Sequence, residues 1–311
     1  MTTLFVTQPK GKTHLTPKGH AECPERLDWV EQALTKPRFA PLKRKIAESG
    51  DLSLAEEVHD RSVLANLQAA RPTEGIAQID ADTFMSPGSL DSAATALGAG
   101  LLALKEVFTG KADNAFCAIR PPGHHAERSR SMGFCLINTI AIVARQAQNL
   151  YGVERVAIVD FDVHHGNGTQ DIFKGDKNIF YGSSHQMPLF PGTGALAEIG
   201  VGNIFNAPLP PESGSEEMHE AYQERILPAL ENFSPELILI SAGFDAHQRD
   251  PLANLNWTNN DFAWLTGKLM DVAEQKCNNR IVSLLEGGYD MAGLAGGVVS
   301  HVAMLQDGTL L

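Results

Sequence analysis

Two aspartates and a histidine alternate along the end of one apolar run. The segment 155–170 reads RVAIVDFDVHHGNGTQ, and its regularly spaced ionisable residues are Asp160, Asp162 and His164. Successive side chains of a strand point to opposite faces, so these three would project to the same side, with Asp162 and His164 about 6–7 Å apart at the backbone. This separation suits two ligands of one metal ion, whereas Asp160 could be a buried carboxylate that supports a metal-binding or catalytic histidine.

A second segment ends in the same way. Residues 241–247 read SAGFDAH and follow the apolar run ELILI. If the two runs form neighbouring parallel strands, either Asp245 or His247 could supply a third ligand, and the spacing alone does not choose between them. One imidazole nitrogen and two carboxylate oxygens with an open fourth position are typical of a catalytic rather than a structural zinc site.

Two further loops carry groups suited to proton transfer and hydrogen bonding. In RPPGHHAE (120–127) the adjacent His124 and His125 follow a stiff Pro-Pro-Gly step, and a neutral-range pKa makes histidine a general acid and base. In LLEGGYD (284–290) a Gly-Gly step precedes Tyr289, whose hydroxyl can donate to an oxyanion. Each signal alone also fits an ordinary turn, but four apolar runs that all end this way favour one shared site.

Apolar, β-branched runs alternating with helical patterns predict the scaffold. Strands are expected at 4–7, 115–119, 155–160, 178–181, 203–207, 236–241 and 280–285, and helices at 24–34, 89–108, 134–150, 213–233, 258–276 and 291–305. Several of the strand-like runs are hydrophobic throughout, as in strands covered on both faces. The pattern predicts a single α/β domain over 1–311 with a mostly parallel sheet, helices on both faces, and ligands beyond the carboxyl ends of the strands.

Composition restricts the class of protein. Of the 311 residues 43% are hydrophobic and 20% are charged, which predicts a sizeable core, and the formal net charge of −12 argues against direct nucleic-acid binding. No segment of the sequence approaches the length of a membrane span. The cysteines (Cys23, Cys117, Cys135 and Cys277) are scattered, which favours reduced thiols and a cytoplasmic location.

The motifs, in this order, resemble the histone deacetylase superfamily, particularly its class II and bacterial amidohydrolase branches. The matching segments are PERL at 24–27, RPPGHHAE at 120–127, MGFCLIN at 132–138, DFDVHHGNGTQ at 160–170, FPGTG at 190–194, SAGFDAH with DPL within 241–252, and EGGYD at 286–290. They span nearly the whole chain. The resemblance implies the arginase–deacetylase fold, a central, mostly parallel eight-stranded sheet with helices on both faces.

The resemblance also implies roles for individual residues. It makes Asp162, His164 and Asp245 the ligands of a zinc ion, which ferrous iron could replace, and so selects Asp245 over His247. It makes His124 and His125 the tandem catalytic histidines, Tyr289 the tyrosine of the transition state, and Asp160 the carboxylate beside the first histidine. The position where class I members have a second carboxylate holds Asn167. His125 would then lack an ionised partner, so we expect its pKa to be lower than in a full dyad.

Further positions follow from the same resemblance. Gly133, Phe134 and Phe190 are expected to line a narrow channel for an aliphatic lysine stem, with Leu252 and Asp82 at its rim. A potassium or other monovalent cation is expected near main-chain oxygens, with residues Asp160, Asp162, His164, Ser183 and Ser184.

The implied function is removal of acetyl or other acyl groups from lysine side chains. Leu252 stands where polyamine-specific relatives carry an acidic gatekeeper, which favours an acyl-lysine peptide or protein over an acetylpolyamine or another small acyl-amine. Two alternatives are a non-catalytic acyl-lysine binder, which would predict a damaged motif, and an arginase-like ureohydrolase, which would need a second metal. The sequence is compatible with a homo-oligomer.

Overall fold

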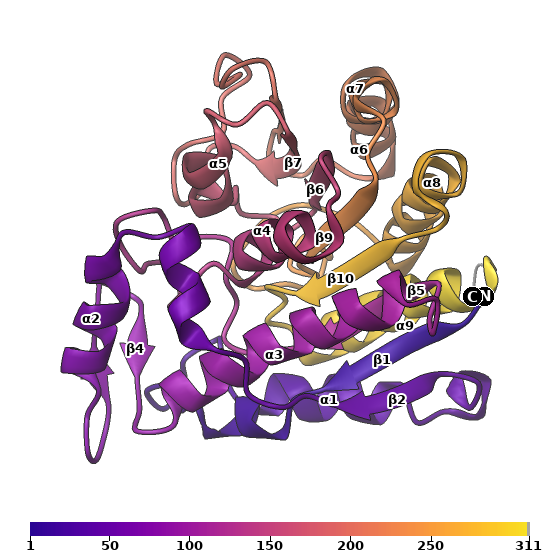
Figure 1. Cartoon of the computed structure of the whole chain (residues 1–311). Coiled ribbons are helices and arrows are strands. Elements are labelled where there is room, and N and C mark those ends of the chain that lie inside the picture. The colour runs from indigo at the N-terminus through magenta and orange to yellow at the C-terminus, as the bar shows by residue number, and fades with distance from the viewer. Residues whose placement is uncertain (310–311) are drawn as a thin grey trace.

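The structure, a computed structural model that describes residues 1–309, is built on one eight-stranded sheet (Figure 1). Along the sheet the strand order is β2-β1-β5-β10-β9-β6-β7-β8, and every neighbouring pair is parallel. The bounds are β1 Thr3–Thr7, β2 Lys43–Ile46, β5 Asn114–Ala118, β6 Val156–Asp160, β7 Ile179–Gln186, β8 Ile204–Leu209, β9 Leu237–Ala242 and β10 Ile281–Leu285. The predicted fold class is therefore confirmed. Positions 310–311 of the predicted domain lie outside the described residues.

Helices form a layer on each side of this sheet. The bounds are α1 Glu25–Ala33, α2 Arg61–Ala70, α3 Ser89–Phe108, α4 Thr139–Tyr151, α5 Asn167–Phe173, α6 Ser215–Ala221, α7 Leu227–Phe233, α8 Asn259–Cys277 and α9 Met291–Asp307. Helices α3 and α4 pack on each other and on the central strands, while α1, α8 and α9 pack together on the opposite face (Figure 1). None of the helices within residues 1–309 is long and apolar enough to cross a membrane.

Short elements complete the fold. They are the 3₁₀ turns Pro9–Thr13, Pro37–Phe39 and Leu52–Glu57, the π-helical turn Tyr222–Ile226 between α6 and α7, and the two-residue strands β3 Ala77–Gln78 and β4 Phe84–Met85. Strands β3 and β4 pair antiparallel outside the main sheet, next to the segment that holds Asp82.

The central strands are buried on both faces. Every residue of β5, β6, β9 and β10 is buried, as their continuous hydrophobicity predicts. These four strands are consecutive in the sheet, and each leads directly into one of the four polar motifs. Because parallel strands end at the same edge, the motifs converge there.

The structure differs from the predicted elements in several places, including the start of α4 and the edge of the sheet. The helix predicted from residue 134 begins at Thr139, because the Asn138 side chain accepts a hydrogen bond from the Ala141 N–H (3.1 Å) and caps the helix there. Residues 132–138 instead form a turn that carries Gly133 and Phe134. The edge strand β2 was not predicted, since its sequence KRKI lacks the apolar character of the central strands.

Candidate active site

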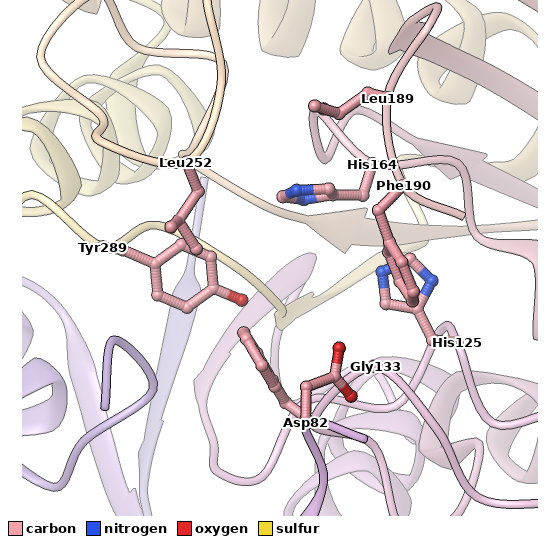
Figure 2. A pocket seen from close by; sticks show the side chains of 9 residues that line it. Asp82, His125, Gly133, His164, Leu189, Phe190, Leu252 and Tyr289 are labelled. Carbon is pink, nitrogen blue, oxygen red and sulfur yellow. The ribbon is translucent and has the colours of Figure 1, made fainter. Parts of the chain in front are cut away.

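A cavity of about 240 Å³ opens at the carboxyl edge of the sheet (Figure 2). Its lining residues come from seven separate segments: Asp82, His125, Gly133, Phe134, His164, Leu189, Phe190, Leu252 and Tyr289. All five residues that the family resemblance assigned to the substrate channel and its rim are among them. The sequence reasoning missed Leu189, which adjoins Phe190 and carries no polar group to mark it.

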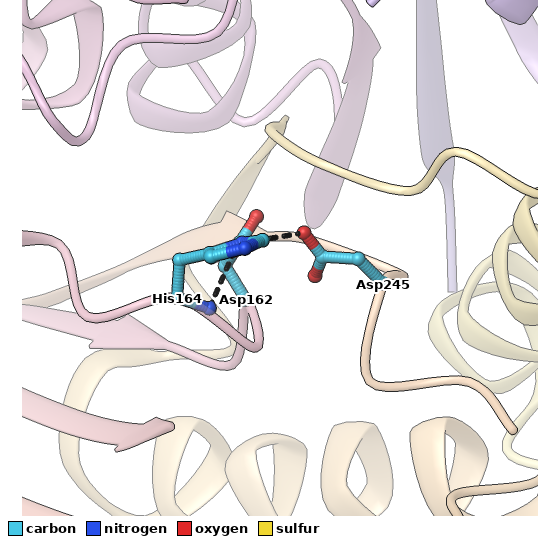
Figure 3. Close-up of side chains that lie close together, drawn as sticks. All are labelled: Asp162, His164 and Asp245. Atoms are coloured by element: carbon cyan, nitrogen blue, oxygen red, sulfur yellow. Dashed lines mark hydrogen bonds and ion pairs between the residues drawn. The ribbon is translucent and has the colours of Figure 1, made fainter. Parts of the chain in front are cut away.

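Asp162, His164 and Asp245 form a close group (Figure 3), of which His164 lines this cavity. All three are buried, and one ligand atom from each lies within 4.8 Å of the others. The Nδ1 atom of His164 is 3.2 Å from Asp162 Oδ1 and 3.1 Å from Asp245 Oδ2. His247, the alternative ligand, is not part of this group, and its Nδ1 atom accepts the Arg249 N–H at 3.2 Å.

Backbone groups hold the two carboxylates of this group in place. The N–H groups of His164 and Gly287 donate to Asp162 (2.9 and 2.8 Å), and the N–H of Val163 donates to Asp245 Oδ1 (2.9 Å). The remaining oxygen of Asp245 faces the His164 ring. Gly287 is required at this point, since a Cβ there would run into the carboxylates of both aspartates.

The charge of this group fits a divalent cation. Burial disfavours a charged His164, yet hydrogen bonds and charge from Asp162 and Asp245 raise its pKa to about 10. A positive charge is therefore stabilised between the two carboxylates. A metal ion would take the place of that proton, and the donor set of one nitrogen and two oxygens suits zinc or ferrous iron.

The first histidine of the pair is held by a buried carboxylate. His124 Nδ1 is 3.0 Å from Asp160 Oδ2, which also accepts the Tyr181 hydroxyl at 3.0 Å. Burial opposes a charged His124, but Asp162 and Asp160 outweigh it and raise the pKa of His124 well above its usual value. Asp160 and Asp162 therefore favour the protonated form of His124.

The second histidine has a neutral partner. His125 Nδ1 is 2.8 Å from Asn167 Oδ1, and Asn167 Nδ2 donates to Glu127 Oε1 at 2.7 Å. Burial, followed by the positive charges of His124 and His164, lowers the pKa of His125 well below its usual value. Since Nδ1 donates to the Asn167 oxygen, the Nε2 atom of the neutral ring carries the lone pair, as a general base requires.

Tyr289 faces these groups from the other side of the cavity, with its hydroxyl directed inward (Figure 2). Burial raises the pKa of Tyr289, so the phenol stays protonated and able to donate. The Arg26 guanidinium lies over its ring, 5.0 Å from the centroid. Arg26 belongs to the PERL segment, and sequence reasoning gave it no role because the carbonyl groups that it binds are about 260 residues away.

The channel wall is fixed by unusual backbone geometry. Gly133 and Phe134 both have positive φ angles, 60° and 67°, and a positive φ is costly for a residue with a Cβ. The Thr83 hydroxyl accepts the Phe134 N–H at 3.1 Å, and the His20 ring packs edge-on against the Phe134 ring at 4.7 Å. Sequence reasoning missed Thr83 and His20 because neither lies in a strand-end motif.

The expected cation-site residues lie at the end of β6, in the loop that follows it, and on the adjacent strand β7. Asp160, the last residue of β6, pairs with Ser183 of β7. The Ser183 hydroxyl lies 3.0 Å from His185 Nδ1, and the Ser184 hydroxyl lies 2.9 Å from the Tyr222 hydroxyl. The pairing of β6 with β7 therefore brings Asp160 close to Ser183. That a cation binds there is a proposal.

This fold and this group of side chains at the edge of its sheet are those of a deacetylase-type amidohydrolase. The model of the histone deacetylase domain matches residues 20–305, and the chain belongs to the histone deacetylase family. The resemblance found in the sequence motifs is therefore confirmed.

Individual relatives agree with this assignment. The chain is 38% identical over 302 residues to "Histone deacetylase 10, chloroplastic" of Oryza sativa subsp. japonica, covering 90% of this chain and 68% of that protein. It is 37% identical over 280 residues to "Histone deacetylase-like amidohydrolase" of Pseudomonas aeruginosa, covering 88% and 73%. The crystal structure of the HDA15 HD domain superposes with a TM-score of 0.91 at 31% identity, covering 100% of this chain and 90% of that one.

Proposed function

We propose that this protein is a zinc-dependent deacylase that removes acetyl or other acyl groups from lysine side chains. The observation that carries the proposal is the group of Asp162, His164 and Asp245, whose His164 lines a cavity together with His125 and Tyr289. Family membership supports amide hydrolysis as the reaction class.

The chain's own residues suggest how the reaction proceeds. When held by the Asp–His–Asp group, zinc (or ferrous iron) would supply a Lewis acid that polarises the amide carbonyl and lowers the pKa of water. His125 accepts the proton of the attacking water at Nε2 and returns it to the departing amine. The Tyr289 hydroxyl donates to the carbonyl oxygen as it gains negative charge, a contact worth about 3–4 kcal/mol. His124 stays charged beside Asp160 and stabilises the same negative charge.

The walls of the cavity favour an aliphatic stem. Phe134 and Phe190 contribute aromatic surface, and Leu252 contributes apolar surface at the rim. An acyl-lysine side chain fits such walls because its methylene groups are apolar and its amide is the part that reaches the base. In a peptide substrate, the Asp82 carboxylate at the rim would accept a backbone N–H.

Asp82 also favours a second candidate substrate. A carboxylate at the rim can attract the ammonium group of an acetylated polyamine, whereas Leu252 offers such a group nothing. The proposal further includes a potassium or other monovalent cation near Asp160 and Ser183. The free cysteines Cys23, Cys117, Cys135 and Cys277 support a cytoplasmic location.

Substrate competition tests the proposal. The zinc-loaded protein is assayed on an acetyl-lysine peptide and on a mono-acetylated polyamine, with Asp82→Asn as the variant and Glu212→Gln, an exposed acid on another loop, as its matched control. We expect a higher kcat/KM for the peptide. A higher value for the polyamine that collapses in Asp82→Asn would establish the second candidate, and no turnover of either amide would refute the proposed function.

A further inference from the structure

A buried carboxylate joins the rim of the cavity to the loop that carries Tyr289. Asp250 is 8% exposed and lies two residues before Leu252. Its Oδ1 atom accepts the Leu252 N–H at 3.0 Å, and its Oδ2 atom accepts the N–H groups of Tyr289 at 2.7 Å and Asp290 at 3.3 Å. All three donors are backbone groups, so this carboxylate fixes the main chain of two loops.

The loop before Tyr289 has little intrinsic stiffness. Two glycines precede the tyrosine, and Gly288 has a φ of 119°, a conformation that other residues rarely adopt. Arg26 holds this part of the loop by donating to the carbonyl oxygens of Glu286 (2.5 Å) and Gly288 (2.7 Å). The backbone N–H of Tyr289 itself is held by Asp250. The position of the tyrosine Cα therefore depends on a residue from the rim loop.

We propose that Asp250 is the positioning residue for Tyr289 and couples its hydroxyl to the rim loop 249–252. The inference rests on the proposed function, because it takes the Tyr289 hydroxyl as the donor to the developing oxyanion. Leu252 and Tyr289 lie next to each other on the cavity wall although they belong to separate loops (Figure 2). A misplacement of about 1 Å can cost about 10²-fold in rate, so the position of the main chain matters to the reaction.

The chemistry of the contact requires a carboxylate. Asp250→Asn keeps the shape of the side chain but turns one acceptor oxygen into an N–H donor that would face backbone N–H groups. A buried donor is then left unpaired, and the two loops can separate. Arg249 provides a matched control, since its exposed ion pair with Asp290 (2.8 Å) joins the same two loops without contacting Tyr289.

A double-mutant cycle on the zinc-loaded full-length protein tests the coupling. We expect Asp250→Asn to lower kcat on an acetyl-lysine peptide by about 10–10²-fold with KM within about threefold, and Arg249→Gln to change kcat by less than about threefold. In a Tyr289→Phe background, Asp250→Asn should change kcat by less than about twofold, because the group through which it acts is gone. Equal losses in both backgrounds would overturn the inference.

A spectroscopic measurement keeps the inference testable apart from activity. The chain has four tyrosines, and with 3-fluorotyrosine incorporated, the ¹⁹F signal of Tyr289 is identified by its loss in Tyr289→Phe. In Asp250→Asn this signal should shift or broaden while those of Tyr151, Tyr181 and Tyr222 stay unchanged. An unmoved Tyr289 signal would refute the positioning role.

Two controls separate the possible failures. If Asp250→Asn does not fold, Asp250→Glu retains the charge and displaces the acceptor oxygens by one methylene, and the same cycle and spectrum are measured with it. If Tyr289→Phe keeps full activity, the proposed function fails. If Tyr289→Phe is impaired and the Asp250 variants are not, only the inference about Asp250 fails.

Discussion

Exchanging the partner of His125 should move the acid limb of the pH–rate profile. His125 must be neutral to accept a proton, and its pKa is lowered by burial and by the charges of His124 and His164. We therefore expect kcat/KM of the native protein to stay high as the pH falls and to decline only below about 6.5, the ordinary histidine value. In Asn167→Asp, a carboxylate would replace the amide oxygen that lies 2.8 Å from His125 Nδ1.

The structure allows this exchange at constant charge. Asn167 also donates to Glu127 at 2.7 Å, so Asn167→Asp alone would oppose two carboxylates. The double variant Glu127→Gln/Asn167→Asp reverses the roles, because the new glutamine can donate to the new aspartate. An opposite charge at this distance raises a pKa by about 1–3 units, and each unit corresponds to about 1.4 kcal/mol favouring the protonated ring.

The assay is the pH dependence of kcat/KM on an acetyl-lysine peptide between pH 5 and 9. The double variant should move the acid limb upward by about 1–2 units and lose activity selectively at pH 6. Glu127→Gln alone serves as the control, since it keeps Asn167 and should leave the limb in place. An acid limb that stays at the native position in the double variant would show that His125 is not the base.

Three further changes probe other parts of the structure. Tyr289→Phe should lower kcat by about 10²–10³-fold at unchanged metal content, measured by steady-state kinetics and elemental analysis; a loss below threefold would contradict the hydroxyl's role. Gly243→Ala should reduce bound zinc, because a Cβ there would run into Asp162; a full zinc equivalent in a folded variant would argue against this crowding. Glu106 pairs with Lys45 at 2.8 Å, and this hydrogen bond lowers the pKa of Glu106 to about 2. The stabilisation of the folded state by this pair is therefore present above pH 4.5 and lost as the pH falls toward 2. Glu106→Gln should lower the free energy of unfolding by about 1 kcal/mol at pH 7 and much less near pH 2.5; equal effects in urea titrations at both values would refute this.

Much of the fold was predictable because the central strands are buried on both faces. Continuous apolar runs identified β5, β6, β9 and β10, and the motif after each strand showed which edge would carry polar groups. The edge strand β2 was not predictable in this way, since half of its residues face solvent and three of its four are basic. The start of α4 depended on a cap by Asn138, while helical periodicity continued beyond it.

The candidate site was predictable where its residues lie close together in the sequence. The Asp162 and His164 pair follows from the alternation of one strand, but spacing could not choose between Asp245 and His247. That choice depends on how the chain turns after β9, which the family resemblance supplied and which places Asp245 in the ligand group. Arg26 and Asp250 escaped notice because they act through backbone groups of a distant loop.

The central claim is that Asp162, His164 and Asp245 hold the metal on which amide hydrolysis depends. The most direct measurement is activity on an acetyl-lysine peptide as zinc is added back to the metal-depleted protein, with bound zinc counted per chain. We predict that activity rises to a plateau at one equivalent, and that Asp245→Ala neither binds that equivalent nor regains activity. Full activity in the metal-depleted protein, or a plateau only at two equivalents, would contradict the account.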